Sequence, residues 1–553
     1  MTRAAPLGGV AVLAFAAGAV DGTSSGRAER QLVTRYVSAW EHEDYPRMYN
    51  LLDRGSRRGI SQRRFVAAYE RAARVATLSS LLPGRFGSRS GDIIPVSIRV
   101  GTRVFGTLRE TLEVPLAGSG SDARIRFSAE LLFPGLRRGE RLVRHVALAP
   151  RAALLASDGT PLAQGPMRTS PIPDVAGQIV GTLGRISKTK ATRYAAEGYP
   201  PRAKVGLNGL ERIFQRRLAG RPGGTLLAGD RVLAQVSAVA GSSVTTTIDP
   251  RIERAAITAM AGGYAGIVAM DPRTGGLLAL AGVAFSSLQP PGSTMKIITA
   301  TGALDAGIVK LGDTFPVMTS ATIDGYTLQN ASGEACGGTL LNAFAVSCNS
   351  VFAPLGARLG AGRLVAIAKR FGFDQPSSIP GAAESLIPSA SRIGDDLAVG
   401  SSAIGQGTVQ STALEMTDVA ATIAMRGRRP IPTLIAHQEP RFADVTSARV
   451  AGLVQRMMVA VVEFGTGTVV QIPGVKVAGK TGTAELRNTT VASTDPNAPP
   501  SGSPMNTDSW FVGYAPVGAP RIAVGALFPA QGSGAATAAP AVREVLVTAL
   551  RAR

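Results

Sequence analysis

Hydrophobic residues recur every four positions in two stretches near the start of the chain. The first stretch carries Leu32, Tyr36 and Trp40, and the second carries Phe65, Tyr69 and Ala73. Residues four apart lie on one face of an α-helix, so each stretch predicts a helix with one buried side. We therefore expect residues 28–80 to be mainly helical.

The pattern changes to alternation between residues 93 and 147. Apolar and polar residues alternate in the segments 93–101, 107–116 and 123–133, with Gly- and Ser-containing turns between them. A period of two predicts half-buried β-strands. Helices followed by a sheet make one α+β domain over residues 28–147. Residues 148–245 have mixed patterns punctuated by Gly and Pro, which indicates a second module.

A third pattern begins at Asp249-Pro250, where the proline favours the first turn of a helix of about a dozen residues. Two apolar runs follow, residues 266–271 and 276–282, and a short Pro/Gly segment separates them. This arrangement predicts a β-hairpin. Residues 484–509 are rich in Asn, Ser and Pro and are expected to form a long loop.

Residues 4–20 are apolar and uncharged. Their length is close to the lower limit for spanning a bilayer. We expect residues 1–24 to act as an uncleaved signal-anchor. Two alternatives stay open: a signal peptide cleaved near Ala19, and a buried core helix, which the early Pro and Gly residues disfavour.

The chain has 553 residues and a net charge of +21. The length indicates roughly three or four domains. A strong positive charge is typical of nucleic-acid-binding proteins, but here the Arg residues are scattered and no basic stripe with interleaved aromatic residues is present. We therefore expect no nucleic-acid partner. For an exported protein, the charge favours anionic lipid headgroups and cell-wall polymers.

Few residues of the chain are typical metal ligands. The sequence contains three His residues and two Cys residues, Cys336 and Cys348. So few histidines disfavour a His-rich metal site, and two cysteines cannot form a zinc knuckle. The cysteines are either two buried thiols or one disulfide, which requires an oxidising compartment.

Residues 290–304 carry the first candidate chemistry. A Pro-Pro-Gly segment is followed by an apolar helical run, so Ser293 lies at a helix N-terminus, where backbone N–H groups favour negative charge. Lys296 follows on the same helix face. A serine hydroxyl needs a base to act as a nucleophile, and a lysine buried among apolar neighbours can have a pKa low enough to serve. Ser187 and Lys190 have the same spacing, but their polar surroundings predict a solvated loop.

A second motif is Ser347-Cys348-Asn349. The serine hydroxyl can relay a proton, and the Asn349 amide can bind a peptide backbone through both its donor and its acceptor. The tripeptide has little specificity when it is considered alone.

A third motif is Lys480-Thr481-Gly482-Thr483, which a short apolar run precedes. The run predicts a strand beside a cleft. Lys480 supplies positive charge for a substrate carboxylate and Thr481 supplies a hydroxyl. Gly482 allows another chain to approach the backbone closely.

The three motifs occur together and in this order, and the set resembles that of penicillin-binding proteins and serine β-lactamases. The predicted hairpin at 266–282 also resembles the first two strands of a transpeptidase domain. The segments AIGQG (403–407) and WFVGYAP (510–516) resemble further landmarks of that domain.

The resemblance extends over nearly the whole chain. Residues 246–553 resemble a complete transpeptidase domain, and the preceding residues carry no glycosyltransferase motif, which is typical of a class B, monofunctional penicillin-binding protein. Residues 28–147 resemble a nuclear transport factor 2-like N-terminal domain of the methicillin-resistance and actinobacterial type. Residues 148–245 resemble the family's linker or dimerisation module.

The resemblance implies a multidomain α+β protein. The C-terminal domain is expected to have the penicillin-binding/serine β-lactamase-like fold, with an antiparallel sheet flanked by helices and an all-helical subdomain.

The resemblance also implies a D,D-transpeptidase that cross-links peptidoglycan stem peptides. Ser293 is expected to attack the penultimate D-Ala of a stem that ends in D-Ala-D-Ala. Lys296 is the expected general base, and Ser347 relays a proton towards the leaving D-Ala. Asn349 is expected to hold the donor peptide amide and to help fix Lys296.

The remaining motif residues are expected to bind the substrate. Lys480 and Thr481, next to Gly482, bind the terminal carboxylate in the family's mechanism. The backbone N–H groups of Ser293 and Thr483 form the oxyanion hole. An amine of a neighbouring stem then resolves the acyl-enzyme and forms the cross-link, and β-lactams acylate the same serine.

No metal and no organic cofactor are implied. The implied partners are stem peptides (a D-Ala-D-Ala donor and an amine acceptor), β-lactams, the cytoplasmic membrane and a wall-synthesis glycosyltransferase complex. The implied location is the cell membrane, with a single N-terminal anchor and the catalytic domain outside the cytoplasm. A cleaved and secreted enzyme is the alternative.

Two features depart from the family's pattern. About ten residues separate the hairpin from Ser293, where many relatives have a longer insertion, and Asp508 precedes Ser509 where relatives often have His. The position of Cys348 between two motif residues also leads to a hypothesis. We expect a Cys336–Cys348 disulfide that braces the active-site loop.

Two other function classes remain open on sequence grounds. A D,D-carboxypeptidase or a β-lactamase would use the same serine, although no residue for activating a deacylating water can be identified for a β-lactamase. A non-catalytic β-lactam sensor or scaffold is disfavoured because all three motifs are intact and no multi-span region or effector domain is visible.

Overall fold

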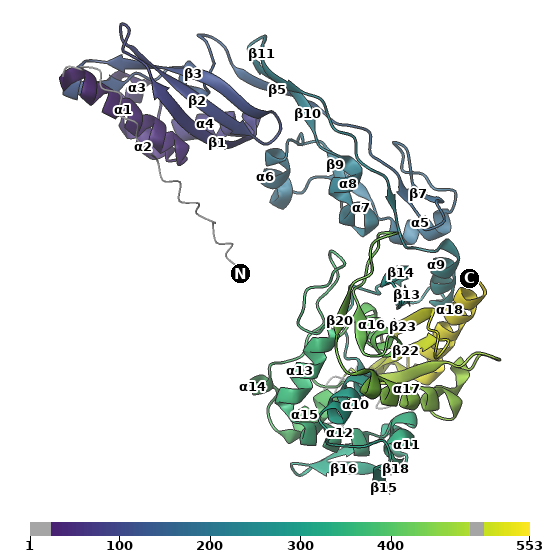
Figure 1. Ribbon diagram of the computed structural model, residues 1–553. Coiled ribbons are helices and arrows are strands. Elements are labelled where there is room, and N and C mark those ends of the chain that lie inside the picture. The colour runs from purple at the N-terminus through teal and green to yellow at the C-terminus, as the bar shows by residue number, and fades with distance from the viewer. Residues whose placement is uncertain (1–23, 487–502, 553) are drawn as a thin grey trace. The chain divides into compact units, whose positions relative to one another are not determined.

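The computed structural model describes residues 24–486 and 503–552 (Figure 1). The apolar segment 4–20 and most of the predicted loop 484–509 lie outside the described residues. The chain divides into two compact units. Unit 1 comprises Met1–Ala149, Arg185–Ala203 and Arg221–Val239, and unit 2 comprises Pro150–Gly184, Lys204–Gly220 and Ala240–Arg553.

Helices open unit 1, as the sequence predicts. They are α1 (Ser24–Glu41), α2 (Tyr45–Asn50), α3 (Arg54–Gly59) and α4 (Gln62–Ala76). The side chain of Ser61 caps α4 by accepting from the Arg64 N–H. The two apolar stripes face each other and are buried except for the half-buried Ala73, and the hydroxyls of Tyr36 and Tyr69 lie 2.7 Å apart.

A four-stranded antiparallel sheet completes the core of this part of unit 1. Its strands, in spatial order, are β1 (Leu78–Phe86), β2 (Ile93–Thr102), β3 (Gly106–Ala117) and β4 (Arg124–Ile125). The predicted strands at 93–101 and 107–116 are confirmed. The sequence did not predict β1, because this strand buries few side chains and shows no alternation.

The prediction of a strand over 123–133 is wrong beyond Ile125. A 3-10 helix, η1 (Gly120–Asp122), precedes β4, and a second one, η2 (Ala129–Leu132), follows it. The second turn places Leu131 and Phe133 in the helical core, where the Tyr69 hydroxyl donates to Leu131 O. Burial against the helices therefore outweighs the alternating pattern.

A second sheet of unit 1 has the order β11-β10-β5. It consists of β5 (Leu142–Ala147), β10 (Gly223–Ala228) and β11 (Arg231–Val236), and α6 (Lys188–Ala196) belongs to the same unit. Residues of the expected module 148–245 thus contribute to both units, and the module's boundaries stay a prediction.

The first part of unit 2 consists of short elements. They are β6 (Leu154–Leu155), β7 (Pro161–Ala163), α5 (Pro173–Ile179), β8 (Leu183–Arg185), β9 (Lys204–Gly206), α7 (Gly209–Ile213), α8 (Gln215–Ala219) and β12 (Val244–Thr245), and the last residue of β8 belongs to unit 1. Glu211 is buried at their centre. It accepts hydrogen bonds from Arg151 Nε at 2.6 Å and from Arg168 Nε at 2.7 Å, so its buried charge is compensated.

A five-stranded antiparallel sheet organises the rest of unit 2. Its order is β14-β13-β23-β22-β21, with β13 (Gly266–Asp271), β14 (Gly276–Gly282), β21 (Ala478–Glu485), β22 (Thr507–Ala515) and β23 (Ile522–Phe528). The predicted hairpin is confirmed as β13–β14. Strand β21, which carries Lys480, lies at the sheet edge, and Gly482 is paired with Trp510.

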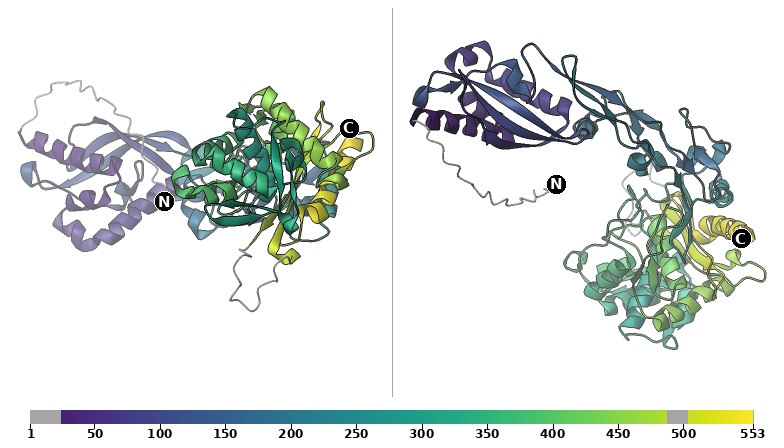
Figure 2. Two further views of the ribbon diagram at one scale, coloured as in Figure 1. Left: turned by 90° about the horizontal axis from the view of Figure 1, so that it is seen from below. Right: turned by 45° about the horizontal axis from the view of Figure 1, so that its top comes forward.

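Helices cover both faces of this sheet. The predicted helix at Pro250 is α9 (Pro250–Ala259), and it packs with α18 (Ala539–Arg551) on one face. Helices α10 (Lys296–Asp305), α16 (Ala413–Ala424) and α17 (Ala448–Glu463) pack on the other face. In Figure 2 the yellow helix α18 and the green helices of unit 2 lie on opposite sides of the strands.

The remaining helices form a mainly helical region beside the sheet. They are α11 (Leu340–Ala345), α12 (Asn349–Leu359), α13 (Ala361–Phe371), α14 (Ala390–Ile393) and α15 (Asp396–Ala403). Three two-stranded hairpins or pairs accompany them: β15 (Thr314–Met318) with β18 (Cys336–Thr339), β16 (Ser320–Ile323) with β17 (Tyr326–Gln329), and β19 (Arg428–Pro430) with β20 (Phe442–Asp444). Short turns of helix are η3 (Gly292–Met295), η4 (Ala331–Gly333), η5 (Thr468–Val470), η6 (Pro504–Asn506) and the π-helix η7 (Gly534–Ala538).

In the described ranges, no single helix has the length and apolarity needed to cross a membrane. One pair of consecutive helices, Asn349–Leu359 and Ala361–Phe371, is together long and apolar enough, but the pair is bent sharply at the junction between them.

Candidate active site

The candidate nucleophile Ser293 lies on the 3-10 turn η3, which leads directly into α10. The turn is held by glycines: the Gly292 N–H donates to Gly405 O at 2.9 Å, and Gly292 has a left-handed φ of 54°. A Cβ on Gly292 would lie 2.7 Å from Thr483 O. Among the described residues, the half-buried Ser293 hydroxyl has no hydrogen-bond partner, so it is available to a substrate.

Lys296 lies one helical turn after Ser293 and is fully buried. Its Nζ donates to Ser347 O at 2.7 Å and to Asn349 Oδ1 at 2.7 Å. Burial, and after it the charge of Lys480, hold the pKa of Lys296 well below its ordinary value. Both causes favour the neutral amine that a general base requires.

Ser347 brings the two lysines together. Its Oγ accepts from Lys480 Nζ at 2.9 Å and from Lys296 Nζ at 3.3 Å. Ser347 lies in the connection between α11 and α12 with φ of 65°, a left-handed conformation that is uncommon for a residue with a side chain. Such strain is often found at functional positions.

Lys480 extends from the edge strand β21 and is also fully buried. Besides Ser347 Oγ, it donates to Thr481 O at 3.0 Å. Its ammonium lies 5.6 Å from the centre of the Phe344 ring, a distance typical of a cation–π contact. Burial lowers the pKa of Lys480 to about 7.

Glycine at position 482 is required by close packing. A Cβ at this position would lie 2.9 Å from Pro291 O and 2.9 Å from Trp510 Cβ. The strand that carries Lys480 therefore contacts the segment just before Ser293. The Thr483 hydroxyl accepts from the Gly534 N–H at 3.2 Å.

The structure joins Cys336 and Cys348 in a disulfide. Cys336 is on β18, and the buried Cys348 immediately precedes α12. The bond therefore ties a β-strand to the connection that holds Ser347. That it braces the active site stays a hypothesis.

The structure thus brings together the residues that the three motifs predict. Ser293 and Lys296 come from η3 and α10, Ser347 and Asn349 from the α11–α12 connection, and Lys480 to Thr483 from β21. The arrangement places one available hydroxyl near a buried lysine and a second buried lysine beside an edge strand. This arrangement can perform acyl transfer through a serine ester.

Sequence reasoning assigned no role to three other residues at this site. Gly405 accepts the Gly292 N–H, and the AIGQG landmark was the signal that could have indicated it. The Thr466 hydroxyl lies 2.5 Å from the Thr481 hydroxyl, and no sequence signal pointed to it. Gln329 O accepts from Asn349 Nδ2 at 3.0 Å and so orients that amide.

The second Ser-x-x-Lys pair lies elsewhere. Ser187 and Lys190 are exposed in unit 1, as expected of a solvated segment. The expected loop is wrong, because Lys188–Ala196 form the helix α6.

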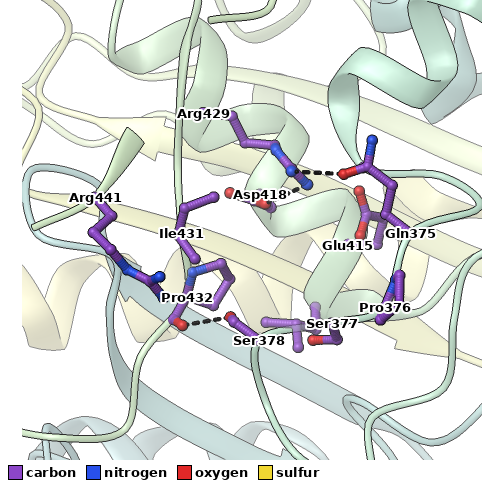
Figure 3. A pocket seen from close by; sticks show the side chains of 12 residues that line it. Gln375, Pro376, Ser377, Ser378, Glu415, Asp418, Arg429, Ile431, Pro432 and Arg441 are labelled. Carbon is purple, nitrogen blue, oxygen red and sulfur yellow. Dashed lines mark hydrogen bonds and ion pairs between the residues drawn. The ribbon is translucent and has the colours of Figure 1, made fainter. Parts of the chain in front are cut away.

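A pocket of about 350 Å³ in unit 2 does not coincide with the motif residues, and no motif residue among the described ones lines it. Figure 3 shows Arg429 between Gln375 and Asp418 in this pocket, with Glu415 alongside. Burial raises the pKa of Glu415 to about 7 and that of Asp418 well above its ordinary value. The ion pair of Arg429 with Asp418, at 3.7 Å, connects the strand β19 to the helix α16.

Three family models match the chain. The penicillin binding protein transpeptidase domain matches residues 265–547, the penicillin-binding protein dimerisation domain matches 149–244, and the NTF2-like N-terminal transpeptidase domain matches 28–140. The chain therefore belongs to the penicillin-binding protein transpeptidase family, and its domain set is that of a class B member.

The chain is similar to several curated proteins of this family. It is 31% identical over 456 residues to the peptidoglycan D,D-transpeptidase PbpA of Mycobacterium tuberculosis, which covers 70% of this chain and 84% of that protein. It is 33% identical over 427 residues to PbpA of Mycolicibacterium smegmatis, covering 65% of this chain and 80% of that protein.

Solved structures are similar as well. The D,D-transpeptidase domain of a peptidoglycan glycosyltransferase from Eggerthella lenta has 29% sequence identity and a TM-score of 0.58, covering 73% of this chain and 99% of that one. Penicillin-binding protein A of M. tuberculosis, solved as an imipenem acyl-enzyme complex, has 26% identity and a TM-score of 0.57, with coverage of 73% and 99%. These neighbours confirm the expected penicillin-binding fold.

Proposed function

We propose that the chain is a peptidoglycan D,D-transpeptidase that cross-links stem peptides through an acyl-enzyme on Ser293 and is inhibited by β-lactams. The observation that carries the proposal is the convergence of two buried lysines on Ser347 Oγ, at 3.3 Å from Lys296 and 2.9 Å from Lys480. The family membership and the relatives named above support the same activity.

Acylation begins with Lys296. Burial and the nearby charge of Lys480 lower the pKa of Lys296 and so favour its neutral amine, which takes the proton of the Ser293 hydroxyl. Ser293 Oγ forms a bond to the carbonyl carbon of the penultimate D-Ala. The peptide C–N bond then breaks, and the terminal D-Ala leaves with a proton relayed through Ser347.

The substrate is held by the motif residues around Ser293. Lys480 and Thr481 bind the terminal carboxylate, and Asn349 binds the donor peptide amide. The backbone N–H groups of Ser293 and Thr483 stabilise the oxyanion of the tetrahedral intermediate, where each donor contributes roughly 3 kcal/mol. The amine of a neighbouring stem then attacks the ester carbonyl and regenerates the serine.

Hydrolysis of the acyl-enzyme is the competing function. A β-lactamase needs a group that activates water for deacylation. Among the described residues, no carboxylate forms a hydrogen bond or ion pair with Ser293, Lys296, Ser347 or Lys480. This observation favours a long-lived acyl-enzyme that an amine resolves.

Labelling with a fluorescent penicillin tests the proposal. We expect stable labelling of the wild type and none of Ser293→Ala. Ser187→Ala is the matched control, because it removes the serine of the exposed Ser-x-x-Lys pair, and we expect it to label normally. Absence of label on the folded wild type would refute the proposal, and release within minutes would favour a hydrolase.

We also propose that residues 1–24 anchor the enzyme in the cytoplasmic membrane, with unit 2 outside the cytoplasm, where it works beside a wall-synthesis glycosyltransferase. The apolar, uncharged run at 4–20 supports the anchor. We expect the full chain to stay in the membrane fraction after an alkaline carbonate wash and a chain without residues 1–23 to be released. Release of the full chain would contradict anchoring.

A further inference from the structure

A segment that the motifs do not include contacts the strand β21. Residues Ala530–Ala538, here called the backing segment, connect β23 to α18 and include the π-helix η7. The Gly534 N–H donates to the Thr483 hydroxyl at 3.2 Å. A Cβ on Gly534 would collide with the carbonyl oxygens of Gly482 and Trp510. The segment therefore lies directly against the backbone of β21 and β22.

The position of Gly482 makes this contact relevant to the site. The Cβ direction of Gly482 is occupied by Pro291 O at 2.9 Å, whereas its carbonyl oxygen and N–H lie next to Gly534. The strand is thus enclosed at this point between the segment that leads to Ser293 and the backing segment. A shift of the backing segment would therefore change the position of the Gly482–Thr483 backbone relative to Ser293.

Two adjacent residues of β22 hold the backing segment in place. The Ser509 hydroxyl donates to Ser533 O at 2.8 Å and accepts from the Ala538 N–H at 3.0 Å. Ser509 is fully buried and is paired across the sheet with Thr483. Asp508 Oδ1 accepts from the Ala530 N–H at 2.9 Å. Both ends of the segment are therefore fixed to the strand next to β21.

Ser509 contacts the backing segment at the level of Thr483, its partner across the sheet. The Ser509 hydroxyl bonds to Ser533 O, one residue before Gly534, and to the N–H of Ala538, the last residue of η7. Its two hydrogen bonds consequently set the position of Gly534. An oxyanion-hole donor acts only when it is correctly placed, and an error of about 1 Å can cost a hundredfold in rate.

We propose that Ser509 is a positioning residue of the transpeptidase: through Ser533 and Gly534 it places the Gly482–Thr483 backbone against the Ser293 turn. Asp508 holds the other end of the backing segment through its hydrogen bond with the Ala530 N–H. This inference rests on the proposed function, because the Thr483 N–H is the expected oxyanion donor.

The test is stopped-flow acylation of the purified chain by a fluorescent penicillin, which separates the dissociation constant of the first complex from the rate constant of acylation. We expect Ser509→Ala to lower the acylation rate constant about tenfold and to leave the dissociation constant within about twofold. Ser509→Thr keeps the hydroxyl and is expected to restore most of the rate.

Gly534→Ala is the stronger perturbation. The backbone at Gly534 lies outside the left-handed region, so alanine adds only the collision with Gly482 and Trp510. We expect an acylation rate constant roughly a hundredfold below that of the wild type.

Thr422→Val is the matched control. It removes a fully buried hydroxyl that donates to Asp418 O within α16, and we expect it to change the melting temperature without changing acylation. Wild-type acylation rates in folded Ser509→Ala and Gly534→Ala, or an equal loss in Thr422→Val and Ser509→Ala, would overturn the inference. Failure of the wild type itself to acylate would instead count against the proposed function.

Discussion

Replacing Lys480 with methionine should make the protein more stable and much less active. Lys480 is fully buried, and burial lowers its pKa from 10.5 to about 7. The difference between these values corresponds to a cost of about 5 kcal/mol for keeping the charged form in the folded protein. The substitution also removes the hydrogen bonds of Lys480 to Ser347 Oγ and Thr481 O, each of which stabilises the folded protein by roughly 1.5 kcal/mol. A net gain of about 2 kcal/mol remains.

The gain should depend on pH in one direction. Below pH 7 the lysine is charged in both the folded and the unfolded chain, so the full cost is present. Between pH 7 and 10.5 the folded protein releases the proton first, and the cost falls. Above 10.5 both states are neutral and the cost is gone. The advantage of Lys480→Met should therefore be largest below pH 7 and should disappear in strongly alkaline solution.

The assay is urea unfolding followed by Trp510 fluorescence in a Trp40→Phe background, because Trp510 lies on β22 beside β21. Penicillin acylation is measured in parallel. We expect the acylation rate to fall roughly a hundredfold, because Lys480→Met removes the group that binds the substrate carboxylate. Lys476→Met is the control, because Lys476 is 61% exposed and should change neither property. A Lys480→Met variant that is less stable than the wild type at pH 6 would refute the reasoning.

Three further predictions follow from single contacts. Glu253 is fully buried, its pKa is raised to about 7, and its Oε1 lacks a hydrogen-bond partner among the described residues. Because a carboxyl group with a raised pKa destabilises the folded protein where it is ionised, Glu253→Gln should stabilise the protein by about 3 kcal/mol above pH 7. Urea unfolding should show that this gain becomes smaller as the pH falls towards 4.5. Thiol titration of the denatured, unreduced protein should find no free thiol, and Cys336→Ser with Cys348→Ser should cost about 3 kcal/mol of stability; two titratable thiols would contradict the disulfide. Gly482→Ala should slow penicillin acylation at least tenfold, because its Cβ would lie 2.9 Å from Pro291 O; an unchanged rate in stopped-flow labelling would contradict this packing argument.

The sequence predicted those parts of the fold that depend on local patterns. The helices around Tyr36 and Phe65 and the hairpin β13–β14 have strong periodicity or turn signals, and the structure contains them. The predictions failed where tertiary contacts outweighed the pattern. Residues 126–133 alternate like a strand, yet the burial of Leu131 and Phe133 against α4 favours a 3-10 turn.

The candidate site divides in the same way. The motif residues were found because their order and spacing are specific. The roles of Gly405, Thr466 and Ser509 were not predicted, since each is a common residue type whose partner lies in another segment of the fold. Thr466 and Thr481 are neighbours only because the connection after α17 passes beside β21.

By itself, the sequence determined which chemical groups the protein has and in which local elements they lie: a serine at a helix start, a lysine one turn later, and a lysine on a strand before a glycine. Only the tertiary structure decided that Lys296 and Lys480 meet at Ser347 and that both lie out of contact with water. The physical reason is that a pKa and a reaction geometry depend on burial and on distances between segments that are far apart in the chain. A local pattern contains neither quantity.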